Sequence, residues 1–465
     1  MVTGRPACGE TTCQSPGLVG IRFPGRVPPQ SRACQEAIGV DRFLTGAARI
    51  GSFSNSNRRW WFRFVLPALA MLIVIGAVST PVAAQSTIDR LPYRKHPVDY
   101  FGPEENNVSR LFERVRTGEV TLESDPRHGY LPAVLRALDV PAESQLLVFA
   151  KNAANARLIS PQNPRALYFS DDISIGWTPG AAAIEISVID LKKGPVFYAL
   201  RFREDGSARL TRDDNCLTCH VSENTLQVPG FALRSFLTDA AGKPVSGYSS
   251  IDHTTPYPKR WGGWYVTGDA SGFGHMGNLA TADALSKFEK GQLRVPFVDL
   301  AGTTPVAKHL RATSDVLPML VHDHQMRFYT LLTRLRYEAA FEKPLATLDP
   351  FLRCLLFADE PPLPAAIVGD LHYRKWFESA GKSPGENALR EFELRTRLFR
   401  HRCSWLVDSA AFRSISEPLH QKIRGRLREI LEAEVPPQGF EWLTGDDRTQ
   451  LLELLSPRFR DVGEP

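Results

Sequence analysis

In the centre of the chain, apolar residues gather in short runs of the kind that form β-strands. β-Branched and aromatic residues dominate three runs there, "RALYFSDDISIGW" at 165–177, "AAIEISVIDL" at 182–191 and "PVFYALRF" at 195–202. Pro-Gly and Lys-Lys-Gly separate these runs, and both sequences favour turns. The pattern predicts an antiparallel β meander.

Helical periodicity flanks this predicted sheet on both sides. Apolar residues recur three or four positions apart in "VSRLFERVR" at 108–116 and in "LPAVLRALDV" at 131–140. Beyond about residue 280 the same spacing predicts helices at 281–290, 316–342, 386–406, 413–433 and 446–455. We therefore expect an α+β fold, with a mixed region at 85–300 and a mainly helical region at 301–465 that packs on it.

The beginning of the chain has the pattern of an export signal. Three arginines within 58–63 precede an uncharged apolar run, and "PVAA" ends it at Ala84. This layout predicts a signal peptide at 58–84, cleaved after Ala84, and a periplasmic protein. The alternative is an uncleaved leader that anchors the chain in the membrane. Residues 1–57 show no sustained hydrophobic period, and we interpret them as a disordered extension upstream of the true start.

The basic excess of the chain lies in this leader. Residues 1–84 carry nine arginines and three acidic residues, whereas the remaining chain has 47 basic and 48 acidic side chains. The exported part is therefore close to neutral. It lacks the basic footprint of a nucleic-acid-binding protein, so we expect no nucleic-acid partner.

The motif "CLTCH" at 216–220 carries the clearest chemistry. Composition alone would produce Cys-x-x-Cys-His about 0.0025 times in such a chain. In a c-type haem site, Cys216 and Cys219 would bond the porphyrin and His220 would bind the iron. A dithiol redox pair and a structural zinc site are the alternatives, but the polar flanks and the lack of a second ligand pair favour one covalent haem.

One predicted helix offers a second axial ligand for the iron. Asp315 is a plausible N-cap for the helix at 316–342. At 100° per residue, His324 lies on the apolar face of this helix. His322, Met319 and Met326 fall on the opposite side of the wheel and are expected to face away from the core.

Two other candidates lie in the glycine-rich region between the motif and this helix. Met276 follows His220 at a spacing that suits a methionine on a returning loop. His253 stands near Lys259 and Arg260, which could bind haem propionates. The ranking is His324, then Met276, then His253, and each of the three could instead be a packing residue.

Two further features allow alternative interpretations. "RWGGWYVTG" at 260–268 fits either a wall of the haem pocket or a glycine bulge in a hairpin. Asp171 and Asp172 fit a strand-edge turn better than an ion site. Cys354 and Cys403 are either a disulfide or two buried thiols.

Several of these motifs together resemble a family of exported cytochrome c domain proteins from environmental bacteria, whose function is uncharacterised. The resemblance covers roughly residues 160–340. It rests on "ALYFSDDISIGWTPG", "DNCLTCH" with "VPGF", "DHTTPYPKRWGGWYVTG", "HMGN" and "HDHQMRFYTLLTR". It implies haem binding by Cys216, Cys219 and His220, and it adds His275 to the three candidates for the second ligand.

The sequence thus favours an exported monohaem cytochrome that exchanges electrons with a periplasmic partner protein. A haem-dependent oxidoreductase is the alternative, in which an open iron face binds a small oxidant and His324 acts as acid or base. The chain is larger than one haem requires, which favours the enzyme, but a single motif is unusual for such oxidases. A haem-containing sensor or binding subunit is the third possibility.

Overall fold

The computed structural model describes residues 88–458, except 105, 204, 206, 246–248, 282, 284–285, 288–289, 291–299, 301–303 and 382. The predicted extension at 1–57 and the predicted signal at 58–84 lie outside these residues. Half of the residues of the predicted helix at 281–290 also fall outside them.

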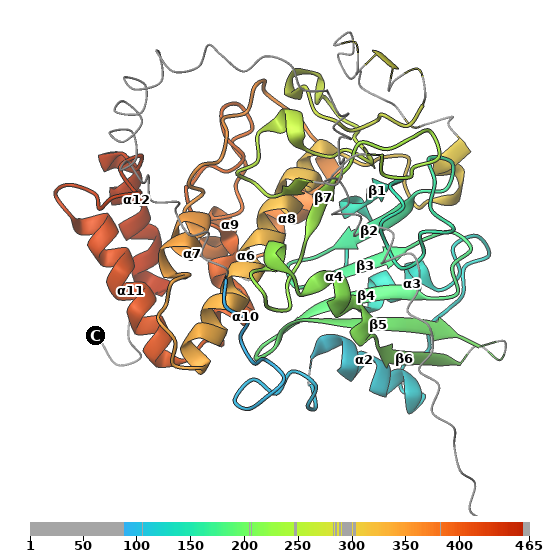
Figure 1. Cartoon of the computed structure of the whole chain (residues 1–465), viewed down its shortest axis with the longest axis horizontal. Coiled ribbons are helices and arrows are strands. Elements are labelled where there is room, and N and C mark those ends of the chain that lie inside the picture. Colours follow the sequence, from blue (N-terminus) through green and yellow to red (C-terminus); the bar gives the residue numbers. More distant parts are fainter. Residues whose placement is uncertain are drawn as a thin grey trace, which may run out of the picture. The chain divides into compact units, whose positions relative to one another are not determined.

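A seven-stranded antiparallel sheet is the centre of the fold (Figure 1). Its strand order is β6-β5-β4-β3-β2-β1-β9. The strands are β1 Leu146–Val148, β2 Arg165–Phe169, β3 Ile173–Trp177, β4 Ile184–Asp190, β5 Gly194–Phe202, β6 Ala208–Arg212 and β9 Trp264–Tyr265. A separate hairpin-like pair joins β7 Leu233–Ser235 to β8 Ser249–Ile251.

The meander is confirmed, with two differences in detail. The run at 165–177 is two strands, and Asp171 and Asp172 lie in the turn between them, as expected from their residue type. β6 stands between the third run and the "CLTCH" motif, so the motif does not follow the third run directly. β6 was missed because its residues are half-exposed and polar, which hides the alternation of an edge strand.

Both faces of the sheet are buried. Leu147 and Tyr168 belong to a core cluster that includes α2 and α3, whereas their neighbours Leu146 and Phe169 belong to a cluster that includes the C-terminal helices. Successive side chains of a strand point to opposite faces, so each face of the sheet packs into a different hydrophobic cluster. Burial on both faces explains why the strands read as nearly continuous apolar runs.

The C-terminal part is mainly helical, which confirms the α+β class. In the described residues, the helices before this part are α2 Asn107–Arg116, α3 Leu131–Ala137 and α4 Leu217–His220. Those within it are α6 Val316–Ala340, α7 Leu348–Leu355, α8 Leu371–Ser379, α9 Pro384–Ala388, α10 Ala410–Arg413, α11 Glu417–Glu432 and α12 Gly445–Leu455. None of the helices in the described part of the chain has the length and apolar character needed to cross a membrane.

The predicted helix at 386–406 is wrong. α9 ends at Ala388, and the chain then turns back so that Phe392 pairs with Phe399 and their rings stack 5.1 Å apart. Leu394, between them, has a φ of 63°, which a helix does not allow. The apolar spacing there comes from a loop packed on the aromatic core, which sequence periodicity cannot separate from a helix.

The long helix α6 begins where expected, because Asp315 accepts a hydrogen bond from the Leu317 amide. The expectation that His322, Met319 and Met326 face away from the core is wrong, since all three are buried. α6 packs against the sheet on one side and against α7 on the other. A central helix has no solvent face, so the helical wheel could not identify an outer side.

Candidate functional site

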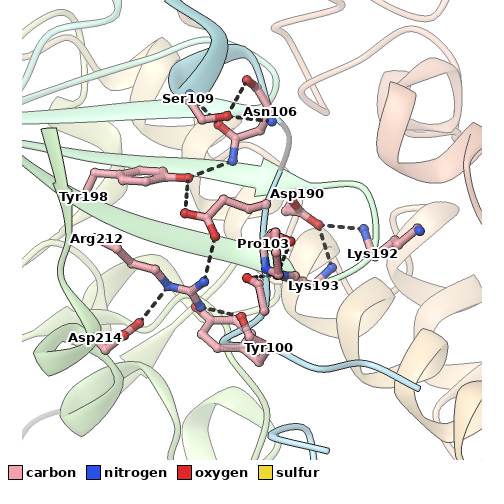
Figure 2. Close-up of polar contacts among 12 residues, drawn as sticks. Tyr100, Pro103, Asn106, Ser109, Asp190, Lys192, Lys193, Tyr198, Arg212 and Asp214 are labelled. Atoms are coloured by element: carbon pink, nitrogen blue, oxygen red, sulfur yellow. Dashed lines mark hydrogen bonds and ion pairs between the residues drawn. The ribbon is translucent and has the colours of Figure 1, made fainter. Parts of the chain in front are cut away.

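The segment that leads into the "CLTCH" motif is fixed by Arg212 at the end of β6 (Figure 2). Its guanidinium donates to Asp214 at 2.8 Å, to Glu104 at 3.0 Å and to the carbonyl oxygen of Tyr100 at 2.6 Å. Asp214 begins the single turn of 3-10 helix that contains Cys216. Arg212 therefore holds the start of the motif against the N-terminal segment.

Figure 2 shows that the same network reaches β5. The Tyr198 hydroxyl donates to Glu104 at 3.1 Å and accepts from Asn106 at 2.9 Å. Lys193 donates its Nζ to the carbonyl oxygen of Pro103 at 2.7 Å. These bonds tie Pro103, Glu104 and Asn106 to the strands beside the motif, which supports the motif on one side.

The motif itself forms one turn of helix, α4, in which Leu217 is the buried residue. Cys216 and Cys219 are both thiols and both partly exposed. Burial, together with the charge of Asp213, raises the pKa of Cys216 to about 12. The two thiols are three residues apart in the sequence, which is the spacing found where a porphyrin is attached covalently.

His220 is held in one orientation by a backbone carbonyl. Its Nδ1 lies 2.8 Å from the carbonyl oxygen of Gly230, and because that oxygen can only accept, Nδ1 carries the proton. Burial lowers the pKa of His220 to about 4, so the imidazole is neutral at pH 7. The Nε2 atom then keeps its lone pair for a metal, an arrangement typical of ligating histidines.

Gly230 is the point where the motif meets α6. Its amide returns a bond to the His220 carbonyl at 3.0 Å. A Cβ atom on Gly230 would lie 3.0 Å from side-chain carbons of both Thr225 and Thr330, the second of which is on α6. The next amide, of Phe231, donates to the Thr330 hydroxyl at 3.0 Å. Only glycine permits this close approach without displacement of a neighbour.

Met326 lies on the side of α6 near Phe231, and His322 is one turn before it on the same side of the helix. Met326 lines a cavity of about 30 Å³ together with Phe231, whose ring centroid is 6.3 Å from that of His220. The His322 ring lies 4.8 Å from Phe169, on the sheet. Burial and the nearby charge of Arg165 lower the pKa of His322 to about 3, and Arg165 also acts on His220.

His324 and His253 meet elsewhere, in the core on the helical side. Their ring centroids are 4.9 Å apart, and Cys354 of α7 joins them. One ligand atom from each of the three residues lies within 4.8 Å of the other two. The side chains come from a loop after β8, from α6 and from α7, and all three are buried.

The polar atoms of this cluster are poorly satisfied. Nε2 of His324 lies 2.8 Å from the Ser404 hydroxyl, but its Nδ1 and both nitrogens of His253 are buried without a hydrogen-bond partner. Burial lowers the pKa of His253 to about 4 and that of His324 well below its usual value. It raises the pKa of the Cys354 thiol. The cluster is thus two neutral imidazoles and a protonated thiol.

Arg260 holds the loop that carries His253. It donates to the carbonyl oxygen of His253 at 2.7 Å and to Asp323 of α6 at 3.2 Å, and its side chain is 1% exposed. Asp323 also accepts from the indole of Trp261 at 3.1 Å. Arg260 is therefore engaged in the core by Asp323 and the His253 carbonyl, while Lys259 is exposed.

The glycine-rich segment pairs with a bulge in the chain that follows β1, where Phe149 and Ala150 are the bulged residues. The carbonyl of Gly263 accepts from the amides of Phe149 and Ala150, two residues against one. A Cβ on Gly262 would collide with the carbonyl oxygen of Phe236. Close approach of two backbones thus explains Gly262, whereas Gly263 has a φ of 81° and a Cβ there would collide with the Cβ of Ala150.

Two remaining sequence candidates, Met276 and His275, lie on the loop that follows the glycine-rich segment at 260–268. Met276 is half-buried, with its Sδ atom 3.9 Å from the hydroxyl of Ser235. His275 is buried and accepts a bond at Nδ1 from the Gly277 amide at 3.0 Å, and its ring lies 5.4 Å from that of Trp261. Both side chains therefore contact neighbours of the glycine-rich segment, and these contacts do not bring them to His220.

Cys354 and Cys403 are buried thiols, not a disulfide. From the sequence, Cys354 was expected either in a disulfide with Cys403 or as a buried thiol, so its place in the histidine cluster was missed. No local signal could have found it, because Cys354 is 30 positions from His324 and 101 from His253.

No family model, no curated protein and no solved structure matches this chain.

Proposed function

We propose that this protein is an exported monohaem c-type cytochrome that transfers electrons to or from a periplasmic partner protein. The observation that carries this proposal is the orientation of His220 within "CLTCH". The motif supplies two thiols and an imidazole in the order that haem attachment needs, and the Gly230 carbonyl directs Nε2 away from the backbone.

Each residue of the motif has a distinct role in this proposal. Cys216 and Cys219 would bond the vinyl groups, and His220 would bind the iron through Nε2. The bound haem would supply a one-electron iron couple. The ring of Phe197, 4.5 Å from that of His220, and the ring of Phe231 would shield the imidazole from water. Their apolar packing would also help to set the potential of the iron.

The second axial ligand is best supported on the side of α6 that faces the motif. Met326 shares a cavity lining with Phe231, and His322 shares the influence of Arg165 with His220. His324 and His253 instead contact each other and the helical core. We therefore place Met326, and His322 one helical turn before it, ahead of His324, Met276 and His253 as candidates.

Attachment of the haem can be tested with single cysteine variants. Cys216→Ala and Cys219→Ala should each weaken covalent retention of haem on a denaturing gel, and the double variant should abolish it. Cys403→Ala is the matched control, because it removes a buried thiol distant in sequence from the motif. Full retention of haem by the double variant would refute the proposal.

Electron transfer can be separated from catalysis at an open iron. Carbon monoxide added to the reduced protein should leave the visible spectrum unchanged if two protein ligands hold the iron. A marked spectral shift would favour the oxidoreductase alternative. His322→Ala and Met326→Ala, compared with His324→Ala, would then show which side chain occupies the sixth position.

Export can be tested by fractionation of cells that express the full chain. Haem-stained protein should appear in the periplasmic fraction, with its N-terminus at residue 85. Recovery in the membrane fraction with an intact leader would support an anchored form instead.

A further inference from the structure

The His253, His324 and Cys354 cluster has no part in haem attachment as proposed above. We propose that these three residues bind one transition-metal ion of the zinc or copper class, at a site separate from the haem. This inference does not depend on the haem, because none of the three residues belongs to the "CLTCH" motif.

The ligand set defines the class of ion. Two imidazoles and one thiolate suit zinc and copper, whereas calcium and magnesium prefer oxygen ligands. Bonds of about 2.0–2.3 Å place ligand atoms within roughly 4 Å of one another. The three ligand atoms lie within 4.8 Å of each other, so a small movement of the side chains would bring them to the separation that one bound ion requires. A divalent ion would displace the proton of Cys354 and form a metal–sulfur bond, with release of one proton.

Three unsatisfied nitrogens point to a missing partner. Nδ1 of His324 and both nitrogens of His253 are buried without a hydrogen bond. A buried polar atom without a partner costs roughly 1–3 kcal/mol, and native proteins hold few of them. A metal ion would use one nitrogen of each ring. It would therefore account for two of the three nitrogens that ordinary packing of this core leaves unpaired.

The surroundings of the cluster fit a metal site. The Ser404 hydroxyl lies 2.8 Å from Nε2 of His324, which leaves Nδ1 of that ring as its ligand atom. Such a second contact usually fixes the orientation of a ligating histidine. The Phe357 ring stacks on His324 with centroids 4.1 Å apart, and it closes one side of the cluster. The site is thus buried and enclosed on this side by an aromatic ring.

The competing explanation is a purely packed cluster, in which neutral imidazoles fill space between aromatic rings. The two explanations differ in what happens when metal is added. A packed cluster has no affinity for metal beyond that of surface histidines, and it gives no thiolate-to-metal charge transfer.

The test uses the full exported chain, purified with its haem and dialysed against a chelator. Zn²⁺, Cu²⁺ and Co²⁺ are titrated separately, and bound metal other than iron is measured by elemental analysis. We expect one ion per chain. Co²⁺ should add a cobalt–thiolate charge-transfer band to the haem spectrum, seen as a difference spectrum, and Zn²⁺ should raise the unfolding temperature.

Variants assign the site. Cys354→Ala should remove the charge-transfer band and weaken binding by at least about 100-fold. Cys403→Ala is the matched control, because Cys403 is also buried but lies outside the cluster, and it should bind like the wild type. If Cys354→Ala does not fold, His253→Asn and His324→Gln replace it in the same assay.

Two results would overturn the proposal. The first is that the wild-type chain retains no ion besides iron in any of the three titrations. The second is that Cys354→Ala binds metal with wild-type stoichiometry and the same spectrum. Haem staining of every sample separates this failure from failure of the proposed cytochrome function, since the motif cysteines are unchanged in these variants.

Discussion

The two groups of cysteine and histidine side chains in this protein differ in almost every physical respect. The "CLTCH" group is contiguous in sequence, lies on one turn of helix, and has partly exposed thiols. The His253, His324 and Cys354 cluster draws on three distant segments and is buried. Both groups offer thiol and imidazole side chains, but only the first can be recognised in a short stretch of sequence.

The two groups also differ in how they are held. The motif depends on backbone bonds within a short loop, where Gly230 accepts from Nδ1 of His220 and donates to its carbonyl. The cluster depends on a buried ion pair, Arg260 with Asp323, that fastens the His253 loop to α6. Substitutions in these two supports should therefore disturb one group and spare the other.

Removal of the buried ion pair should have the largest effect. Asp323→Ala leaves the Arg260 charge buried without its carboxylate, which should lower the free energy of unfolding by about 3–5 kcal/mol. Asp349→Ala is the control, because Asp349 pairs with Arg426 nearer to solvent, and it should cost less than about 1 kcal/mol. Chemical denaturation measures both. An equal cost for the two variants would contradict the support assigned to this pair.

Acid should have the next largest effect, because it should lower the free energy of unfolding through the buried residue His275. The ring of His275 lies 5.4 Å from Trp261, and burial lowers the pKa of His275 to about 4. The unfolded chain binds a proton at this residue below about pH 6.5, whereas the folded chain does so only near pH 4. Stability should therefore fall as the pH drops through this window, and His275 should account for up to about 3 kcal/mol.

The variant His275→Gln isolates this contribution. Unfolding free energies of the wild type and the variant are compared at several values between pH 7 and pH 4. The variant should lose less stability over that range. Parallel curves for the two proteins would show that His275 does not supply the pH dependence.

A change in the motif's support should have the smallest effect. Gly230→Ala places a Cβ 3.0 Å from carbons of Thr225 and Thr330, which should lower the free energy of unfolding by about 1–3 kcal/mol. It should also alter the visible spectrum of a haem bound by His220, but not metal binding at the cluster. Gly425→Ala, in α11 with open space around it, should instead stabilise by about 0.5–1 kcal/mol. A wild-type spectrum in the Gly230 variant would weaken the link between this loop and His220.

Much of the fold could be predicted from local pattern. The meander follows from short apolar runs between turn residues. The helices α6, α11 and α12 follow from apolar residues three or four positions apart. The short helices α7 and α8 were missed, because eight or nine residues give too few turns for a clear period. The segment at 386–406 failed for the opposite reason, since a packed loop imitated a helical period.

The candidate ligands show the same division. His324 was correctly expected to be buried, but His322, Met319 and Met326 were wrongly expected to face outward. A wheel compares residues of one helix with each other and does not contain the elements packed around it. The roles of these residues toward a haem remain predictions.

The sequence by itself determined the antiparallel strands, the long helix that Asp315 caps, and the "CLTCH" motif, because each depends on residues within one or two turns of each other. Only the tertiary structure decided that α6 is enclosed, that His220 is turned by the Gly230 carbonyl, and that Cys354 meets the two histidines. These features depend on contacts between residues far apart in the chain. Such contacts form because several segments bury their apolar surface together, and the spacing of residues along one segment does not record that packing.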